Sequence, residues 1–414
     1  MAGNKIISLA LALTLAIAAS AQVRTGIEVL ESRGFAGLEG KRVGLLTNPS
    51  GVDRNLRSTI DILNDAPEVN LVRLFGPEHG VRGDAHAGDH TSDIVDAATG
   101  LKAYSLYGQY RQPTPEMLEG LDVVVYDIQD VGVRSYTFIS SLGLMMRACA
   151  EQGVEVMVLD RPNPLGGLKV EGCLVEDGFY SFVSQYRIPY VYGLTVGEVA
   201  LLINGEGLNR GQKGNLAPLR CKLTVIPMEG WTRDMRFEDT GLPWVAPSPQ
   251  IPYPQNAVGY PCAGLCGEFS HLNIGVGYTL PFCTFAAEWV DADRLKARLD
   301  TYGIPGVAFR VTHYKPFFGA SAGKVLHGVQ YHFTDYDAAP LSLIQFYVMQ
   351  AAYELWPDHH PFASGNTAMF DKVCGTDQIR KTFGTRCKVK DILDRWTGDT
   401  EAFRVMSSKY LLYK

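Results

Sequence analysis

Several signatures of common enzyme classes are missing from this 414-residue sequence. No G-x-G-x-x-G follows the first predicted strand, and no P-loop occurs, so a dinucleotide cofactor is not supported and we expect no cofactor. No G-x-S-x-G surrounds Ser140 or Ser141, and no Ser-His-Asp order is apparent, which argues against a serine esterase. The sequence also lacks internal repeats and low-complexity segments, and its length favours two domains.

Basic residues are not in excess. The chain has 38 Lys and Arg against 44 Asp and Glu, a net charge of -6. A nucleic-acid partner is therefore not expected, because phosphate binding needs a basic surface. The same balance leaves a neutral glycan open as a ligand, since sugars are held by hydrogen bonds and stacking. The oligomeric state is not readable from the sequence.

Long apolar runs are absent beyond the N-terminus. Lys5 precedes an apolar run over residues 6–19, and Ala19-Ser20-Ala21 fits the small-x-small rule for signal peptidase. The pattern predicts a signal peptide over residues 1–21, with Gln22 as the new N-terminus and a secreted, periplasmic protein. No later run is long enough for a membrane span.

Eight cysteines follow the predicted signal peptide, and an oxidising compartment permits disulfides. Cys262 and Cys266 are close enough in sequence to pair, and Cys374 with Cys387 is a second plausible pair. Zinc is the rival interpretation for Cys262 and Cys266. Connectivity cannot be read from spacing, so these alternatives stay open.

The periodicity predicts an α/β fold. Short apolar strands at 42–47, 69–75, 121–126 and 154–159 alternate with helices at 56–63, 114–116 and 137–152, the first of these with Asn55 as N-cap. Such alternation indicates a parallel sheet covered on both faces. We expect a Rossmann-like catalytic domain over 22–205 and a smaller α/β domain over 206–414. Within the latter, the Gly- and Pro-rich stretch 205–260 crosses between domains. Later strands (308–314, 325–333) and helices (292–302, 342–356 and beyond 377) then follow.

Polar side chains follow each of the predicted strands. They are Asn48, Glu78 with His79, Asp127 through Asp130, and Asp160 with Arg161. Because ligands bind at the carboxyl edge of open α/β sheets, these segments predict one site built from four loops.

Glu78 is the candidate catalytic carboxylate. Glycoside hydrolysis needs a carboxyl group that protonates a leaving oxygen, and a partly desolvated Glu at a strand end suits that role. Asp127 and Asp130 offer a second carboxylate, and Arg134 could bind a substrate carboxylate in a bidentate fork. The alternative for Asp130 and Arg134 is an internal pair that holds the loop. Tyr136 is a candidate for sugar contact or for the core.

Two further clusters are candidates. His79, Asp84, His86, Asp89 and His90 crowd one loop and form a candidate metal site without a recognised spacing. We do not assign a metal, but a metal-dependent hydrolase using His79, Asp84, His86 and Asp89 is the alternative function. A possible sugar-stacking wall in the Pro-rich crossing consists of Trp231, Trp244, Tyr253 and Tyr260.

Long segments of the chain resemble the exo-β-N-acetylmuramidase family, once a domain of unknown function. The matching segments are GLLTNPSGVD (44–53), LFGPEHGVRGDAHAG (74–88), VVYDIQDVGVRSYTFISSL (124–142), VLDRPNPLGG (158–167), YGLTVGEVA (192–200) and PSPQIP (247–252). The resemblance implies an active site between a Rossmann-like domain and a smaller α/β domain. It also implies release of terminal N-acetylmuramic acid from peptidoglycan fragments.

The resemblance assigns Glu78 as the catalytic glutamate. Residues within its motifs are expected at the site: His79, Asp127 and Asp130 in catalysis, and Asn48, Arg82, Gln129, Arg134, Tyr136, Arg161, Asn163, Glu268 and His271 in substrate binding. Three positions depart from the family pattern, with His86 in place of an acid, His271 in place of Asn and Val276 in place of Arg. The lactyl carboxylate of muramic acid needs a cation, so these positions bear on which sugar is recognised. A non-catalytic muropeptide-binding protein is a further alternative.

Overall fold

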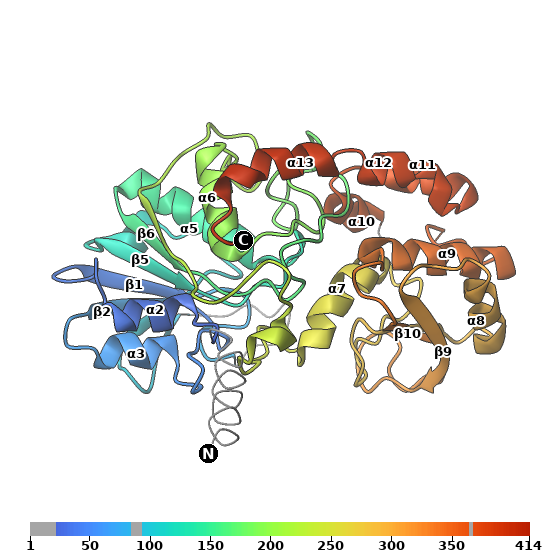
Figure 1. Ribbon diagram of the computed structural model, residues 1–414, viewed down its shortest axis with the longest axis horizontal. Helices are drawn as coiled ribbons and strands as arrows, with labels where there is room; N and C mark the ends of the chain where they lie inside the picture. The colour runs from blue at the N-terminus through green and yellow to red at the C-terminus, as the bar shows by residue number, and fades with distance from the viewer. Residues whose placement is uncertain (1–21, 84–92, 364–366) are drawn as a thin grey trace, which may run out of the picture.

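The computed structural model describes residues 22–83, 93–363 and 367–414, and its larger sheet has seven strands in the order β3-β4-β2-β1-β5-β6-β7 (Figure 1). The strands are β1 (Arg42–Thr47), β2 (Asn70–Gly76), β3 (Ile94–Val95), β4 (Lys102–Ser105), β5 (Val123–Asp127), β6 (Glu155–Leu159) and β7 (Leu223–Ile226). All neighbours pair in parallel except β3, which runs antiparallel to β4. The chain builds outward from β1 in both directions, so the order reverses between β1 and β5.

Helices cover both faces of this sheet. The first part contains α2 (Gly26–Ser32), α3 (Thr59–Asp65), α4 (Pro115–Leu118), α5 (Phe138–Gln152) and α6 (Val196–Gly205). Val123 and Val125 of β5 pack into the core under α2 and α3, whereas Val124 and Tyr126 pack into the core under α5 and α6 (Figure 1). Because both faces are buried, the strands read as continuous apolar runs, and the α/β expectation is confirmed.

A smaller antiparallel sheet follows in the second half. Its strands are β8 (Thr284–Ala287), β9 (Val307–Tyr314) and β10 (Leu326–Phe333), in the order β8-β10-β9. The helices of this half are α7 (Pro254–Gly267), α8 (Ala292–Asp300), α9 (Ile344–Leu355), α10 (Thr367–Cys374), α11 (Gln378–Arg386), α12 (Leu393–Thr397) and α13 (Thr400–Ser407). The second, smaller α/β unit expected from the sequence is therefore present.

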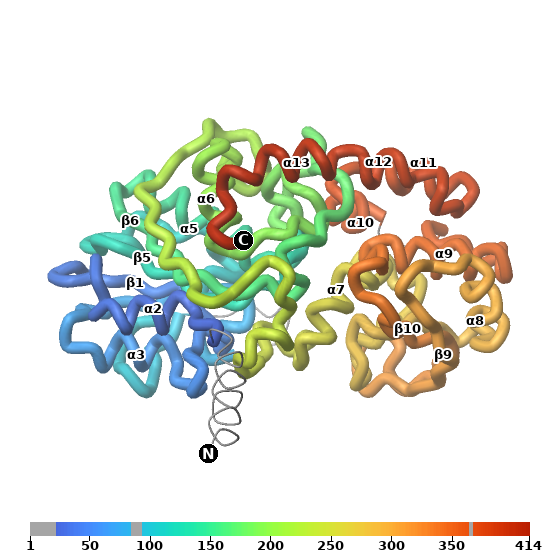
Figure 2. The backbone as a smooth tube through the Cα atoms, in the orientation of Figure 1, coloured from blue at the N-terminus to red at the C-terminus, as the bar shows by residue number. Residues whose placement is uncertain are grey.

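The larger sheet extends past residue 205, where the sequence places a domain boundary. Its last strand, β7, lies beyond that residue, and α7 leads from the large sheet to the small one (Figure 1). The C-terminus then returns to the large sheet (Figure 2). The Tyr413 hydroxyl donates to Asp160 Oδ2 at 2.5 Å, and the Arg233 amide donates to the Lys414 carbonyl at 2.8 Å. The two halves are thus joined by more than one crossing.

Two local expectations are corrected. The helix expected at 56–63 begins at Thr59, because Ser58 and not Asn55 caps it and accepts from the Asp61 backbone N–H at 3.0 Å. All eight cysteines are free thiols. Cys262 and Cys266 lie one turn apart on α7, where Cβ atoms are about 5–6 Å apart, beyond the separation that a disulfide spans. No disulfide joins Cys374 to Cys387 either, and no helix among the described residues is long and apolar enough to cross a membrane.

Candidate active site

A cavity of about 750 Å³, which we call the main cavity, opens where the loops of the large sheet meet α7 and α10. Its wall consists of Glu78, His79, Tyr107, Arg111, Ser135, Tyr136, Thr137, Phe138, Ser181, Phe182, Val183, Gln212, Ser248, Gln250, Ile251, Tyr260, Glu268, Phe282, Met369 and Lys372. Segments from both halves of the chain therefore meet in one hollow, and two of the lining side chains are carboxylates.

Glu78 enters the cavity from the loop that follows β2. Its side chain is half-buried and forms a hydrogen bond with Tyr107. Burial, and then the negative charge of Glu78, raise the pKa of the Tyr107 phenol, so Tyr107 remains a neutral donor to the carboxylate. His79, also in the wall, has φ +77°, a left-handed conformation that non-glycine residues rarely adopt and that clusters at functional sites.

Glu268 is the second carboxylate of the main cavity. It is the C-cap residue of α7, and among the described residues no side chain forms a hydrogen bond or ion pair with it. Burial raises the pKa of its carboxyl group to about 7. The negative end of the helix dipole acts in the same direction. A large share of Glu268 is therefore protonated near neutral pH and can donate a proton.

Aromatic rings also line the main cavity. Tyr136 meets Phe138 and Tyr260 edge-on, with ring centroids 5.0 and 5.5 Å apart, and Tyr260 meets Phe282 at 5.0 Å. Such a wall suits the apolar faces of sugar rings. Of the aromatic residues singled out in the Pro-rich crossing, Tyr260 lines the main cavity. Trp231, Trp244 and Tyr253 do not, and Trp231 packs against Tyr413 instead.

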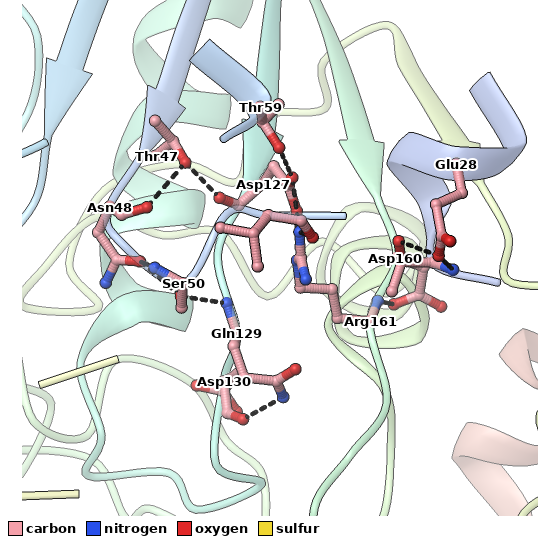
Figure 3. Close-up of polar contacts among 12 residues, drawn as sticks. Glu28, Thr47, Asn48, Ser50, Thr59, Asp127, Gln129, Asp130, Asp160 and Arg161 are labelled. Carbon is pink, nitrogen blue, oxygen red and sulfur yellow. Dashed lines mark hydrogen bonds and ion pairs between the residues drawn. The ribbon is translucent and has the colours of Figure 1, made fainter. Parts of the chain in front are cut away.

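Several predicted site residues form a buried polar layer that does not line the main cavity (Figure 3). Arg161 Nε donates to Asp127 Oδ1 at 2.5 Å, and Thr59 also donates to Asp127. The Ser50 hydroxyl accepts from the backbone N–H of Gln129 at 2.9 Å and donates to Asn48 Oδ1 at 2.5 Å. Three of the four predicted strand-end loops thus lie together, and their polar groups form hydrogen bonds with one another.

This polar layer connects to the cavity wall through the backbone. Asn48 Nδ2 donates at 3.0 Å to the carbonyl of Pro247, the residue before Ser248 in the wall. Gln129 Nε2 donates to the Asp130 and Pro162 carbonyls at 2.8 and 2.7 Å. Asp127, expected as a catalytic carboxylate, is fully buried in its pair with Arg161. Asp127 therefore lies outside the main cavity, in contacts within the protein.

Asp130 and Asn163 are also buried and do not line the main cavity. The Tyr192 hydroxyl and the Gly132 amide both donate to Asp130 Oδ2, and burial raises the pKa of Asp130 to about 6. Asn163 donates to the Leu194 carbonyl at 3.0 Å. A Cβ at Gly132, whose φ is +76°, would lie 2.3 Å from Asn163 Oδ1, so this loop requires glycine there.

Arg134 is not at the cavity, contrary to the role expected for it. All five of its N–H donors are used, with Nε on Ser184 and four bonds of 2.6 to 2.9 Å to the carbonyls of Cys173, Ile188, Val373 and Cys374. The side chain is fully buried, and burial lowers its pKa. The Val373 and Cys374 carbonyls belong to α10. The Arg134 guanidinium therefore links α10 to the first half of the chain by hydrogen bonds.

We expect Arg134→Met to destabilise the protein by about 3–5 kcal/mol, because it leaves the buried Cys173 and Ile188 carbonyls without a donor and removes the charge-assisted bonds to α10. The free energy of unfolding in urea measures this loss. The matched control is Arg395→Met, which removes a surface ion pair with Glu176 and should cost less than about 1 kcal/mol. An Arg134→Met protein as stable as the control would contradict this role.

Two further predicted residues also lie outside the wall of the main cavity. Arg82 pairs with Asp96 at 2.9 Å and with Asp61 at 3.2 Å. His271 packs near Trp289, with ring centroids 5.4 Å apart, and burial lowers its pKa to about 4. Both residues have structural contacts in place of the substrate contacts expected for them.

The candidate metal loop lies mostly outside the described residues, since Asp84, His86, Asp89 and His90 fall between residues 84 and 92. His79 is described and lies in the main cavity. Within 22–83, 93–363 and 367–414, no group of three or more His, Cys, Asp or Glu side chains is placed to hold a metal ion.

Sequence reasoning missed several residues of the wall, and three of these have ionisable side chains. Tyr107, Arg111 and Lys372 come from a loop and from α10, with no motif around them. Glu268 was expected to bind substrate, and the signal that distinguishes it, burial at a helix C-terminus, needs the tertiary structure.

Comparisons with known proteins agree with this architecture. Residues 43–255 match "Exo-beta-N-acetylmuramidase NamZ, N-terminal", and residues 258–413 match the C-terminal counterpart. The peptidoglycan beta-N-acetylmuramidase NamZ of Bacillus subtilis (strain 168) is 40% identical over 392 residues, covering 95% of this chain and 92% of the relative. Two crystal structures of DUF1343 family proteins from Bacteroides fragilis NCTC 9343 are 52% and 28% identical, with TM-scores of 0.90 and 0.77. Each covers 95% of this chain and 99% of its own. The chain belongs to the exo-β-N-acetylmuramidase NamZ family.

Proposed function

We propose that this protein is an exo-acting glycoside hydrolase that releases terminal N-acetylmuramic acid from peptidoglycan fragments. The observation that carries the proposal is the pair of carboxylates, Glu78 and Glu268, in one aromatic-walled cavity. Glycosidases use two such groups, one to protonate the leaving oxygen and one to act at the anomeric carbon. The activity named for the Bacillus subtilis relative supports the same assignment.

Glu268 is the general acid in this proposal. Its pKa of about 7 keeps the proton available near neutral pH, and no neighbouring cation competes for the carboxylate. Glu78, held by Tyr107, is the second carboxylate, which activates water or attacks the anomeric carbon. This division revises the sequence-based expectation, in which Glu78 serves as acid/base and Asp127 or Asp130 offers the second carboxylate.

Arg111 and Lys372 supply the cations that a muramic acid needs. Both line the main cavity, and no described carboxylate forms an ion pair with either. The Arg111 guanidinium lies 4.3 Å from the centroid of the Phe182 ring, which fixes its position without neutralising it. The lactyl carboxylate of the terminal sugar would bind these side chains. Val276, which replaces the family's arginine, does not line this cavity.

Turnover of 4-nitrophenyl β-N-acetylmuramide and its glucosamine analogue, with and without a chelator, tests the function. We expect hydrolysis of the muramide, a strong preference over the analogue, and no effect of the chelator. Activity that is lost to the chelator and restored by metal would favour the metal-dependent alternative. Saturable binding of muropeptides without product would favour a binding protein, and either result would overturn the proposal.

We expect Arg111→Met to lower the preference for the muramide over its glucosamine analogue by about 10- to 100-fold, the value of a charge-assisted hydrogen bond. Turnover of the analogue, which has no lactyl group, should change little. Arg187→Met, at an exposed position outside the cavity wall, is the matched control. An unchanged preference would remove Arg111 from substrate recognition.

We also propose that the protein is exported to the periplasm. The Lys5-led apolar run and Ala19-Ser20-Ala21 support this. Val23, two residues later, is buried against Met228 and Trp231, so folded contacts begin just after the predicted cleavage site. N-terminal sequencing of the protein recovered from its native host should begin at Gln22, and an intact Met1 terminus would contradict export.

A further inference from the structure

A second hollow of about 350 Å³ adjoins the main cavity. Tyr260, Glu268 and Phe282 line both hollows, whereas Glu78, His79, Arg111 and Lys372 line only the main cavity. Glu268 therefore stands at the boundary between two binding spaces. In the proposed reaction, the general acid contacts the oxygen that joins two sugars, so one sugar lies on each side of it.

The wall of the second hollow differs chemically from the main cavity. Small and apolar residues predominate, among them Gly264, Gly267, Ile274 and Val276. Of the described residues that line it, Glu268 alone carries a formal charge, and the remaining polar groups include the Asn273 amide. An anionic muramic acid thus fits the main cavity with its two cations, and a neutral sugar fits the second hollow.

One wall of the second hollow comes from the loop between β9 and β10. The Phe317 amide donates to the Gly277 carbonyl at 2.6 Å, and Tyr278 stacks on Tyr314 and Phe317 at 4.7 and 6.0 Å. Gly277 has φ +88°, and a Cβ there would lie 2.3 Å from the Phe318 carbonyl oxygen. These contacts fix the loop against the turn at 275–278, so the hollow is a built feature.

The same loop presents two aromatic side chains to solvent. Phe317 and Phe318 are 74% and 53% exposed, and Gly319, Ala320 and Ser321 directly after them line the hollow. Contiguous exposed apolar side chains mark interaction sites, and aromatic rings stack well on sugars.

We propose that the second hollow is the leaving-group subsite, which binds a neutral N-acetylhexosamine, and that the Phe317–Phe318 tip binds the sugars that follow. This inference rests on the proposed function and deepens it. The glycan runs from the main cavity, past Glu268, into the second hollow and out over the β9–β10 loop.

The test compares substrates that differ in what they place beyond Glu268. The β-fluoride of N-acetylmuramic acid leaves the second hollow empty, whereas the disaccharide of N-acetylmuramic acid and N-acetylglucosamine fills it. In Ser321→Phe, which fills the hollow, the ratio of kcat/KM for the disaccharide to that for the fluoride should fall about tenfold or more. In Phe317→Ala/Phe318→Ala, the ratio of kcat/KM for a tetrasaccharide to that for the disaccharide should fall about three- to tenfold. Val405→Phe introduces the same ring at an exposed position on α13, which lines neither hollow, and should leave both ratios unchanged.

A binding measurement separates failure of this inference from failure of the proposed function. Calorimetry with Glu78→Gln protein should give tighter binding of the disaccharide than of N-acetylmuramic acid, and Ser321→Phe in that background should abolish the difference. If no glycoside is turned over but this pattern holds, the hydrolase proposal fails and the subsite stands. If turnover occurs but Ser321→Phe and Val405→Phe behave alike in both assays, the subsite is wrong.

Discussion

Glu78→Gln is expected to lower kcat by about three orders of magnitude on every muramide tested, the scale associated with a positioned acid or base. The loss should not depend on the leaving group, because Glu78 acts at the anomeric carbon. Glutamine has the same shape and can still accept from Tyr107, so the fold should be retained. Initial rates with 4-nitrophenyl and 2,4-dinitrophenyl muramides, together with the midpoint of thermal unfolding, measure both expectations.

The control for Glu78→Gln is Glu119→Gln, which makes the same chemical change at an exposed position outside the cavity. It should keep full activity. A Glu78→Gln protein that turns over the muramides at the wild-type rate would remove Glu78 from the chemistry. A protein that loses activity together with its thermal stability would assign Glu78 a structural role instead.

Glu268→Gln is expected to have an effect of similar size that depends on the leaving group. With the disaccharide, whose leaving oxygen must be protonated, kcat should fall by about three orders of magnitude. With the 2,4-dinitrophenyl muramide, whose leaving group departs as a stable anion, the rate should stay within about tenfold of wild type. No described side chain is paired with Glu268, so the substitution breaks no contact within the protein.

The conservative variant Glu268→Asp provides the control for position. It keeps the acid but withdraws it by one methylene, so the disaccharide should be cleaved slowly but faster than by Glu268→Gln. Equal losses on both leaving groups in Glu268→Gln would contradict the role of Glu268 as proton donor. They would instead indicate that it orients the substrate.

Much of the large sheet is predictable because its strands carry unambiguous local signals. The strand expected at 42–47 is β1 as observed, and those at 121–126 and 154–159 differ from β5 and β6 by two residues or fewer. Their alternate residues face two separate cores, so polar residues occur only at the strand ends. β3, β4 and β7 were missed, since strands of 2, 4 and 4 residues are too short to give a clear local signal.

The site is less predictable, because local patterns do not show which polar residues satisfy one another. Asp127 and Arg161 come from neighbouring strand ends and form a buried ion pair, which their separate motifs do not reveal. Arg134 follows the same loop yet turns away to bind carbonyls on α10, 239 and 240 residues along the chain. Glu268 acquires its raised pKa from burial that exists only once α7 packs against α9 and α10.

Arg111 and Lys372 are the converse case, because they line the cavity but no sequence pattern identifies them. Neither belongs to a motif, and they lie in segments far apart in the sequence, yet both line the main cavity. Val276 stands where the family pattern has an arginine. This difference would change the sugar specificity only if residue 276 faced the sugar carboxylate. It faces the second hollow instead, where an apolar side chain suits a neutral sugar.

The pH dependence of kcat on the disaccharide tests the central claim most directly. A general acid works only while it is protonated, and the pKa of Glu268 is about 7, so kcat should fall about tenfold per pH unit as the pH rises above 7. The 2,4-dinitrophenyl muramide should not show this alkaline limb in wild type. In Glu268→Gln, the limb should vanish from the residual disaccharide activity. An alkaline limb near pH 7 that persists in Glu268→Gln would show that another group donates the proton.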